Sequence, residues 1–143
     1  YNNNIFLLTA AEYGHLHIVQ SLLDLGANIF TNNYMVLQKS IDHLDVFFWI
    51  LFYIKGKNIQ NDINFTNALN IILVDRILNN KVHIVQFLVE NYNGLIIDDN
   101  TMLWCIKKGF VECYRLLFEY KILTCQQILE SIKFNKRFIQ KIF

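Results

Sequence analysis

The chain has 143 residues, which is enough for one domain with a sizeable core and too few for two comfortable ones. Apolar residues make up 54% of it and charged residues 17%, a composition that excludes an intrinsically disordered chain. The net charge of +1 excludes binding of polyanions by bulk electrostatics. The charge is uneven along the chain, however. Residues 1–70 have a net charge of −2, from three Lys against five Asp and Glu, and residues 71–143 have a net charge of +3, from ten Lys and Arg against seven Asp and Glu.

In chain order, the first predicted elements are two short helices on either side of Gly14. Small apolar side chains follow Leu7 at +3 and +4 (Ala10 and Ala11), and a second apolar stripe runs through LHIVQSLL at residues 16–23. Spacings of three and four residues give each helix one stripe to bury. Glycine suits the turn between the helices because the chain must take a left-handed conformation to reverse its direction.

The same pattern returns along the rest of the chain. LHIVQSLL is nearly repeated as VHIVQFLV at residues 82–89, an offset of 66 residues, which is twice a period of 33. The frame that begins at Leu7 begins again at Leu37, Leu73, Met102 and Ile128, and turn-forming residues follow these starts: Gly14, Asp42, Asn80, Gly109 and Asn135. Each unit is predicted to be a pair of helices too short to stand alone, so stacked pairs would bury their stripes. We therefore expect an all-α fold.

The second unit contains the most apolar segment, VFFWILFYI at residues 46–54. Nine residues cannot span the hydrocarbon of a bilayer, which takes roughly 20 residues of helix. The aromatic side chains of this segment fit two roles. They can fill the core, because aromatic rings bury large areas, or they can leave an exposed patch for a partner.

The first unit resembles a known family. LLTAAEYGHLHIVQSLLDLGANI, residues 7–29, is similar to the ankyrin-repeat pattern TPLHxAAxxGHxxIVxxLLxxGADI. The resemblance fades after residue 29, where Arg76 takes the place of Ala10 and the loop that includes Gly56 is about four residues longer than the family loop. It implies that residues 1–143 are a single ankyrin-like solenoid of stacked helix-turn-helix repeats, about four with a truncated fifth at the C-terminus, and with weak or absent β-hairpins. The Asn-rich, proline-free style also resembles divergent ankyrin proteins of large DNA viruses, and we expect the chain to be an excerpt of a longer one.

Catalysis and metal binding find little support in the sequence. His15 and His17 are spaced as a metal pair, but no carboxylate or cysteine completes a zinc site with them. Cys105 and Cys113 take the places of small apolar residues in the repeat frame, and reduced thiols are typical of an intracellular protein. No glycine-rich phosphate loop and no Ser/His/Asp arrangement occurs. We expect no enzyme, metal or cofactor, and the family resemblance implies that His15 ties neighbouring turns together.

The ankyrin resemblance also implies a function, because ankyrin arrays bind other proteins through their loop tips and the concave face of their first helices. The partner is expected to be a protein, and a host protein if the viral likeness holds. Candidate tip residues are Asn32, Asn33, Tyr34, Asn61, Asp62, Asn64, Asp98 and Asp99. Candidate residues of the concave face are Glu12, Tyr13, Lys107, Lys108 and Lys133, which would grade from acidic to basic.

Three alternatives to partner binding by this face stay open. In the first, the chain is a structural spacer between flanking domains. The second, nucleic-acid binding by the late basic residues, is weaker because no series of stacking aromatic residues accompanies them. In the third, the same lysines are solvated surface charge without any partner. In each case we expect an intracellular, cytoplasmic protein without a membrane span.

Overall fold

The computed structural model describes residues 2–57 and 62–143, with the side chain of Asn2 left undescribed. Within these residues the chain forms helices joined by turns and short loops, and no strand occurs, so the predicted all-α class without β-hairpins is confirmed. The chain divides into two compact units, which are described separately: unit 1 runs to Ala68 and unit 2 runs from Leu69 to Phe143. No helix in the described part of the chain is both long and apolar enough to cross a bilayer.

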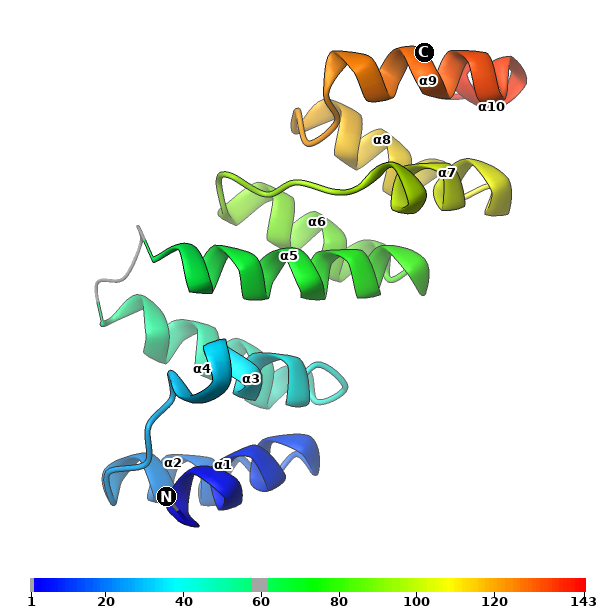
Figure 1. The fold of residues 1–143 in the computed structure, drawn as a ribbon. Coiled ribbons are helices and arrows are strands. Elements are labelled where there is room, and N and C mark those ends of the chain that lie inside the picture. Colours follow the sequence, from blue (N-terminus) through cyan, green and yellow to red (C-terminus); the bar gives the residue numbers. More distant parts are fainter. Residues whose placement is uncertain (1, 58–61) are drawn as a thin grey trace. The chain divides into compact units, whose positions relative to one another are not determined.

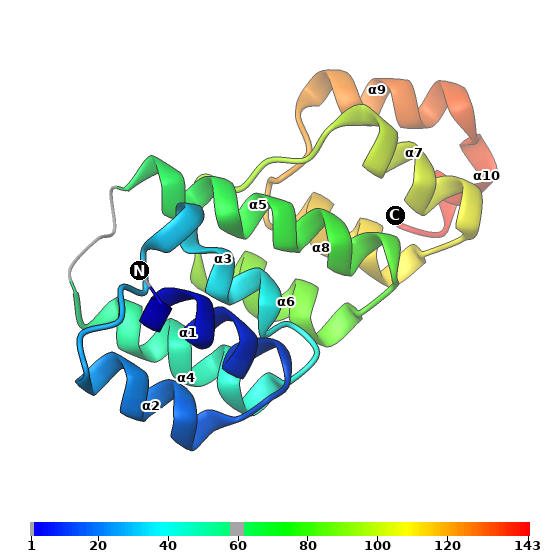
Figure 2. The ribbon, with the colours of Figure 1, turned by 60° about the horizontal axis from the view of Figure 1, so that its bottom comes forward.

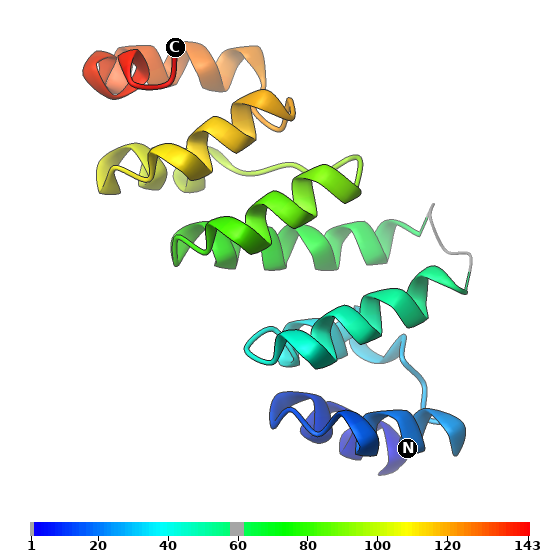
Figure 3. The same ribbon diagram turned by 180° about the vertical axis from the view of Figure 1, so that it is seen from behind.

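Unit 1 consists of two helix pairs. The first is α1 (Asn2–Glu12) with α2 (Leu16–Asp24), and the second is α3 (Thr31–Lys39) with α4 (Leu44–Lys55). Helix α1 packs against both α2 and α3, and α4 contacts α2 and α3. The first helix of each pair lies in one layer and the second in the other, as the views from the front and from behind show (Figures 1 and 3).

The predicted apolar stripes form the core of unit 1. Leu7, Ala11 and Val19 are buried, together with Leu37, Val46, Phe47, Ile50 and Ile54. The two HIVQ segments are equivalent only in part, however. Val19 and Val85 are both buried, but Ile18 is 49% exposed whereas Ile84 is 8% exposed. Within unit 1, α2 contacts α1 and α4, and both lie on the same side of it (Figure 2).

Gly14 makes the turn of the first pair and also receives a neighbouring side chain. Its φ of +77° is left-handed, as the sequence predicts. A Cβ atom at this position would lie 2.4 Å from Nδ1 of His43, so the imidazole ring sits directly against the glycine. His43 is the residue that precedes α4. The His43 ring therefore packs on the turn of the neighbouring pair, and His43 precedes its helix as His15 precedes α2.

The segment after Gly56 differs from the prediction of a long loop. Helix α5 spans Ile63–Leu78, so most of the extra residues extend a helix at its N-terminal end. Apolar residues at spacings of three and four explain this extension, because Phe65 and Ala68 are buried in unit 1 while Ile72 and Leu73 are buried in unit 2. One helix thus contributes to both units.

Unit 2 contains the rest of α5 and five further helices: α6 (Val82–Asn91), α7 (Asp99–Lys108), α8 (Val111–Glu119), α9 (Cys125–Phe134) and α10 (Lys136–Gln140). Helices α7 and α9 pack side by side in one layer, and α6 and α8 pack together in the other (Figures 1 and 3). Helix α10 packs on α9. The buried residues of this unit include Leu73, Leu88, Met102, Cys105 and Leu117.

The aromatic segment of α4 divides between the core and the surface of unit 1. Phe47 is fully buried in the core of unit 1, whereas Phe52 is 76% exposed. Trp49 and Tyr53 are half-buried and stack on each other, with ring centroids 5.4 Å apart. Lys57 lies over the Tyr53 ring at 4.8 Å from its centroid.

Candidate functional site

Helix α7 is held firmly at both ends and presents one polar and aromatic side to solvent. Asp98 caps its N-terminus, where the carboxylate accepts a hydrogen bond from the backbone N–H of Thr101 at 3.1 Å. Gly109 ends the helix in a left-handed conformation, with φ of +74°. Met102 and Cys105 are buried, so the opposite side of the helix is exposed at Trp104, Lys107 and Lys108.

Helix α9 is fixed beside α7 by polar contacts at its N-terminal half. Thr124 and Gln127 form a reciprocal capping box at the start of α9. The buried Gln127 side chain also donates from Nε2 to the carbonyl oxygen of Ile97 at 2.9 Å and to Oδ1 of Asp99 at 3.1 Å. The N-terminal ends of the two helices are therefore together, and both helices run in the same direction from left to right in Figure 1.

A groove with a volume of about 450 Å³ lies between α7 and α9. Its apolar lining combines the buried Met102 with the more accessible Leu103 and Phe134. Its charged lining has two acids and one base, and the full set of lining residues is Asp99, Met102, Leu103, Gln126, Glu130, Lys133 and Phe134. Lys133 lies 4.0 Å from Glu130, at the limit of an ion pair, and its side chain is 75% exposed.

Trp104 and Lys108 form an exposed cation–π pair on α7, outside the set of residues that line the groove. The ammonium of Lys108 lies 4.7 Å from the Trp104 ring centroid, and the indole N–H donates a hydrogen bond to the carbonyl oxygen of Leu78 at 3.3 Å. Trp104 is 37% exposed. In the described part of the chain, neither Lys107 nor Lys108 forms an ion pair with an acidic side chain. The name "α7/α9 face" is used below for Trp104, Lys107 and Lys108 together with the residues that line the groove.

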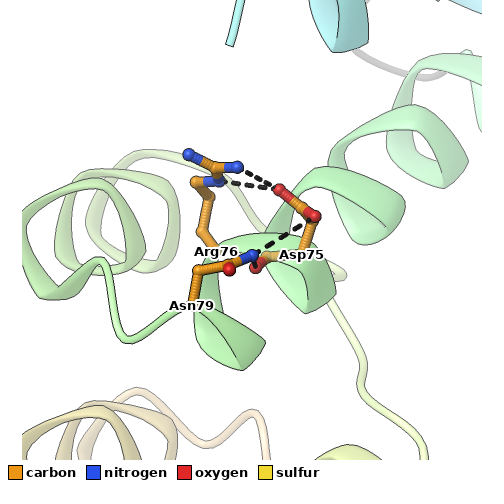
Figure 4. Close-up of polar contacts among 3 residues, drawn as sticks. All are labelled: Asp75, Arg76 and Asn79. Carbon is orange, nitrogen blue, oxygen red and sulfur yellow. Dashed lines mark hydrogen bonds and ion pairs between the residues drawn. The ribbon is translucent and has the colours of Figure 1, made fainter. Parts of the chain in front are cut away.

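On α5, the acidic side chain at the position equivalent to Trp104 already has a cationic neighbour. Asp75 accepts hydrogen bonds from Nε of Arg76, at 2.9 Å, and from a terminal nitrogen of the same guanidinium (Figure 4). Asn79 donates from its amide nitrogen to the backbone carbonyl oxygen of Asp75 at 2.8 Å. Arg76 stands at the small-residue position of the repeat frame and is buried, so its charge offsets that of Asp75.

Comparison with known proteins identifies the first unit of the repeat. The family model that matches is the Ankyrin repeat, over residues 2–34. Residues 2–34 form an ankyrin repeat. No curated protein and no solved structure matches the chain. The predicted resemblance is thus confirmed where its motif is densest, and the all-helical fold carries ankyrin-like helix pairs through both units.

Glu12 and Tyr13, the predicted residues of the concave face in this ankyrin repeat, are both exposed, and the charge of Glu12 is neutralised by a neighbouring lysine. Tyr13 is exposed, and Glu12 lies 3.6 Å from Lys39, which is on the first helix of the next pair. Both partners of this ion pair are substantially exposed, so its contribution to stability is small. The pair nevertheless cancels the acidic charge from which the predicted gradient was to start.

The predicted tip at the end of the ankyrin repeat has a different structure from the expected polar loop. Asn32, Asn33 and Tyr34 all have left-handed φ values of 54°, 54° and 64°. Asn32 and Asn33 are exposed, but Tyr34 is only 2% exposed and belongs to the core. Its ring packs edge-on against Phe30 and Phe65, so the expectation that it faces a partner is wrong.

The candidates around residue 62 are also placed differently. Asp62 accepts hydrogen bonds from the hydroxyl of Tyr34 and from the backbone N–H of Asn64, so its carboxylate already has partners inside unit 1. Asn64 is exposed in the first turn of α5, and so lies on a helix and not in a loop. Asn61 lies outside the described residues.

The titratable groups of unit 2 do not assemble a reactive centre. Burial raises the pKa of the Cys105 thiol to about 12, with a further contribution from Cys113, and raises that of Cys113 to about 11, with a contribution from Glu112. Both thiols are therefore protonated and inert at neutral pH, as expected for small core residues. Among the residues that the structure describes, no group of three His, Cys, Asp or Glu side chains is arranged to hold a metal ion.

The structure brings together two of the predicted site residues and adds others that the sequence did not indicate. Lys133 and Asp99 line the same groove, and Lys107 and Lys108 are exposed on the neighbouring side of α7. Trp104, Glu130 and Phe134 were missed. Trp104 and Glu130 share one position in the repeat frame with Asp75 and Thr9, so an aromatic residue among polar ones was the signal available.

Proposed function

We propose that this chain is a non-enzymatic protein-binding module and that the α7/α9 face of unit 2 is its contact surface. Ankyrin repeats are generally protein–protein interaction modules, and the repeat at residues 2–34 supports that general class. The observation that supports this particular surface is the exposed Trp104–Lys108 pair on α7, the helix that also forms one wall of the groove. We also propose that residues 1–143 form a single ankyrin-like array, that the protein is cytoplasmic and that its partner is a host protein. The three free cysteines support a reducing compartment.

The composition of this surface favours protein recognition. Tryptophan is among the residues that contribute most to binding energy at interfaces, because a large ring is removed from water in one step. The groove volume of about 450 Å³ is enough for one or two side chains of a partner. Lys107 and Lys108 carry charge without an acidic partner among the described residues, so an incoming acid would form a new ion pair.

The test compares capture by four proteins from a lysate of the cells in which the chain occurs. These are the wild type, Trp104→Ala, the double variant Lys107→Glu/Lys108→Glu, and a control with the same change in charge elsewhere, Lys55→Glu/Lys121→Glu. Lys55 and Lys121 are exposed; Lys55 is the last residue of α4, and Lys121 lies two residues beyond the end of α8. Captured proteins are quantified by mass spectrometry, and the best is purified and titrated against each variant.

We expect a protein that the wild type and the control retain and that both face variants lose, with Kd raised at least about tenfold by Trp104→Ala. Retention by all four proteins would place the contact surface elsewhere, with the exposed tip at Asn32 and Asn33 as the next region to test. If none of the four retains a protein, the binding proposal fails and a structural spacer becomes the favoured function.

A further inference from the structure

We propose that this chain binds a second copy of itself, and that the last helix pair of one copy packs on the first helix pair of the other. The surface on the first pair is called the α1/α2 end face below and consists of Phe6, Ile18 and Leu22. The surface on the last pair is called the α9 end face and consists of Cys125, Leu129 and Ile132. Neither surface includes a residue of the α7/α9 face, so this inference is independent of the proposed function.

The α1/α2 end face begins with an apolar stripe on α2. Ile18 is exposed and Leu22, one turn later on the same side of the helix, is half-buried. In the repeat frame, Ile18 corresponds to Cys113 of α8, which is fully buried. Leu22 corresponds likewise to the fully buried Leu117. Helix α8 packs on α6 of the preceding pair, and the Cys113 thiol donates a hydrogen bond to Oδ1 of Asn80, in the turn of that pair, at 3.4 Å. The Ile18 side of α2 is therefore the side that a preceding helix pair covers.

Phe6 extends this face onto α1. Its counterparts, Thr101 in α7 and Gln127 in α9, also stand directly before the first residue of their frames. Phe6 is 58% exposed, whereas Thr101 is 3% and Gln127 is 6% exposed. The Gln127 side chain donates to Asp99 at the start of α7, so this position faces the preceding first helix. Within unit 1, the first pair packs on α3 and α4 (Figure 1), which leaves both Phe6 and Ile18 exposed.

The α9 end face lies on the side of α9 that points away from α7. The Ser131 hydroxyl donates to the sulfur of Met102 at 3.2 Å, so the Ser131 side of α9 faces α7. Leu129 is two residues away, about 200° around the helix, and the other two residues of this face lie one turn before and one turn after it. All three are exposed. Ile132 is 39% exposed, whereas its counterpart Ile106 on α7, which has α9 beside it, is 3% exposed.

The two faces belong to helix pairs of opposite net charge. Residues 1–30 contain two acids and no Lys or Arg, which gives −2, and residues 124–143 contain four bases and one acid, which gives +3. Glu12 already lies close to Lys39, but Asp24 forms no ion pair with any residue that the structure describes. Contact between two faces of the same kind would bring like charges together. The charges therefore favour contact between unlike faces.

The proposed contact continues an interface that the structure already contains. In each unit, first helices pack on first helices, as α1 does on α3 and α7 on α9. Repeat arrays stay soluble when their terminal pairs have a polar outer face, and both end faces described above are apolar instead. A contact between unlike faces is heterologous, so each dimer still has one free face of each kind. Association should therefore continue beyond the dimer.

The first step of the test measures the mass of the 143-residue chain by sedimentation velocity, between about 1 and 500 µM, because a single helix-pair face is small for an interface. A reducing agent prevents disulfide formation by the exposed Cys125. We expect the mass to rise with concentration from 17.0 kDa through the dimer to larger species. Ile18→Glu and Leu129→Glu each place a charge in one end face, so each variant alone should stay at 17.0 kDa.

The second step mixes these two variants in equal amounts. Ile18→Glu keeps an intact α9 end face, and Leu129→Glu keeps an intact α1/α2 end face. The mixture should therefore form a dimer of twice 17.0 kDa and nothing larger. Phe52→Glu is the matched control, because Phe52 is 76% exposed on α4 and lies outside both faces, and it should associate like the wild type. Raising the salt concentration from about 50 to 500 mM should weaken association of the wild type.

Each of the other outcomes contradicts the inference. A wild type that stays at 17.0 kDa over the whole range would overturn it, and so would loss of association in Phe52→Glu. Association that is lost in only one of the two face variants would show that like faces meet. Two monomeric variants that stay monomeric when mixed would show that the two faces do not bind each other. Urea unfolding confirms that each variant is folded, and the α7/α9 face is tested separately by capture from the lysate.

Discussion

Replacing Gly14 by alanine should destabilise unit 1 for two separable reasons. The φ of +77° is costly for any residue with a Cβ atom, by about 1 kcal/mol. The new Cβ atom would also lie 2.4 Å from Nδ1 and 2.7 Å from Cγ of His43, far inside contact distance. Overpacking of this kind costs about 1–3 kcal/mol, and the ring can shift, so we expect a total of about 2–3 kcal/mol.

Two controls separate the backbone cost from the steric one. In a His43→Ala background the ring is gone, so Gly14→Ala should cost only about 1 kcal/mol. Gly109→Ala offers an independent comparison in unit 2. Gly109 has a similar φ of +74°, but a Cβ atom there would meet nothing within 4 Å. Its substitution should therefore cost only the backbone part, again about 1 kcal/mol.

Urea unfolding followed by tryptophan fluorescence measures the loss in free energy of unfolding for the structural unit that carries the substitution. Trp49 lies in unit 1 and Trp104 in unit 2, so a Trp104→Phe background makes Trp49 the single reporter of unit 1. With a slope of about 1–2 kcal/mol per molar urea, Gly14→Ala should lower the midpoint by about 1–3 M. Equal losses with and without His43 would refute the steric argument, and an unchanged midpoint would refute the left-handed turn itself.

Two further predictions concern groups that the structure buries. Tyr34→Phe removes the hydrogen bond to Asp62 and should cost about 1–2 kcal/mol in the free energy of unfolding. Burial, with the nearby Asp62 carboxylate, raises the pKa of Tyr34, so the folded state keeps a proton that the unfolded chain loses near pH 10. The advantage of the wild type over Tyr34→Phe should therefore be full at pH 8 and shrink above pH 10, and a difference that stays constant to pH 11 would contradict this assignment. Of the three thiols, only Cys125 is exposed. Ellman's reagent at pH 8 should therefore react rapidly with one thiol, and with the other two only in denaturant. Equal reaction rates for all three thiols would show that the described core is wrong.

The repeat frame could be predicted from the sequence because it depends on spacing alone. Leu7, Leu37, Leu73, Met102 and Ile128 begin the predicted frames; the first four are buried in the structure, whereas Ile128 is half-buried. The left-handed turns at Gly14, Asn80 and Gly109 follow from the same frame, since the residue types that tolerate a positive φ stand at those positions. Asp42 does not adopt a positive φ, and Asn135 is extended with φ of −154°.

The differences arise where neighbours outside the local pattern decide the conformation. Asn- and Asp-rich sequence near Ile63 predicts a loop, but the apolar spacing of Phe65, Ala68 and Leu69 continues through it and extends α5. The polar residues around Tyr34 predict an exposed tip, yet Phe30 and Phe65 pack edge-on against its ring. The contact with Phe65 joins residues about 30 positions apart, and no local rule reports it.

The candidate site was predictable in its charges and not in its shape. Lys107, Lys108 and Lys133 are visible in the sequence as a late basic group, and their register position followed from the repeat. The groove between α7 and α9 depends on which side chains fill the space between two parallel helices. Phe134 replaces the lysine that stands at the equivalent position on α7, and its large exposed ring is a property of that one pair.

The parallel course of α7 and α9 has a consequence for the stability of the helices themselves. Aligned peptide groups give each helix a partial positive charge at its N-terminus and a partial negative charge at its C-terminus. Asp98 and Asp99 stand at the N-terminus of α7, and Lys107, Lys108 and Lys133 stand at the C-termini of α7 and α9. Each side chain therefore carries the charge opposite to the partial charge of its helix end, which stabilises the helix. Each such contact is worth about 0.3–1 kcal/mol at an exposed site. Substitutions that reversed these charges to suit a different partner would therefore destabilise α7 and α9. Helix stability thus limits which charges this face can carry.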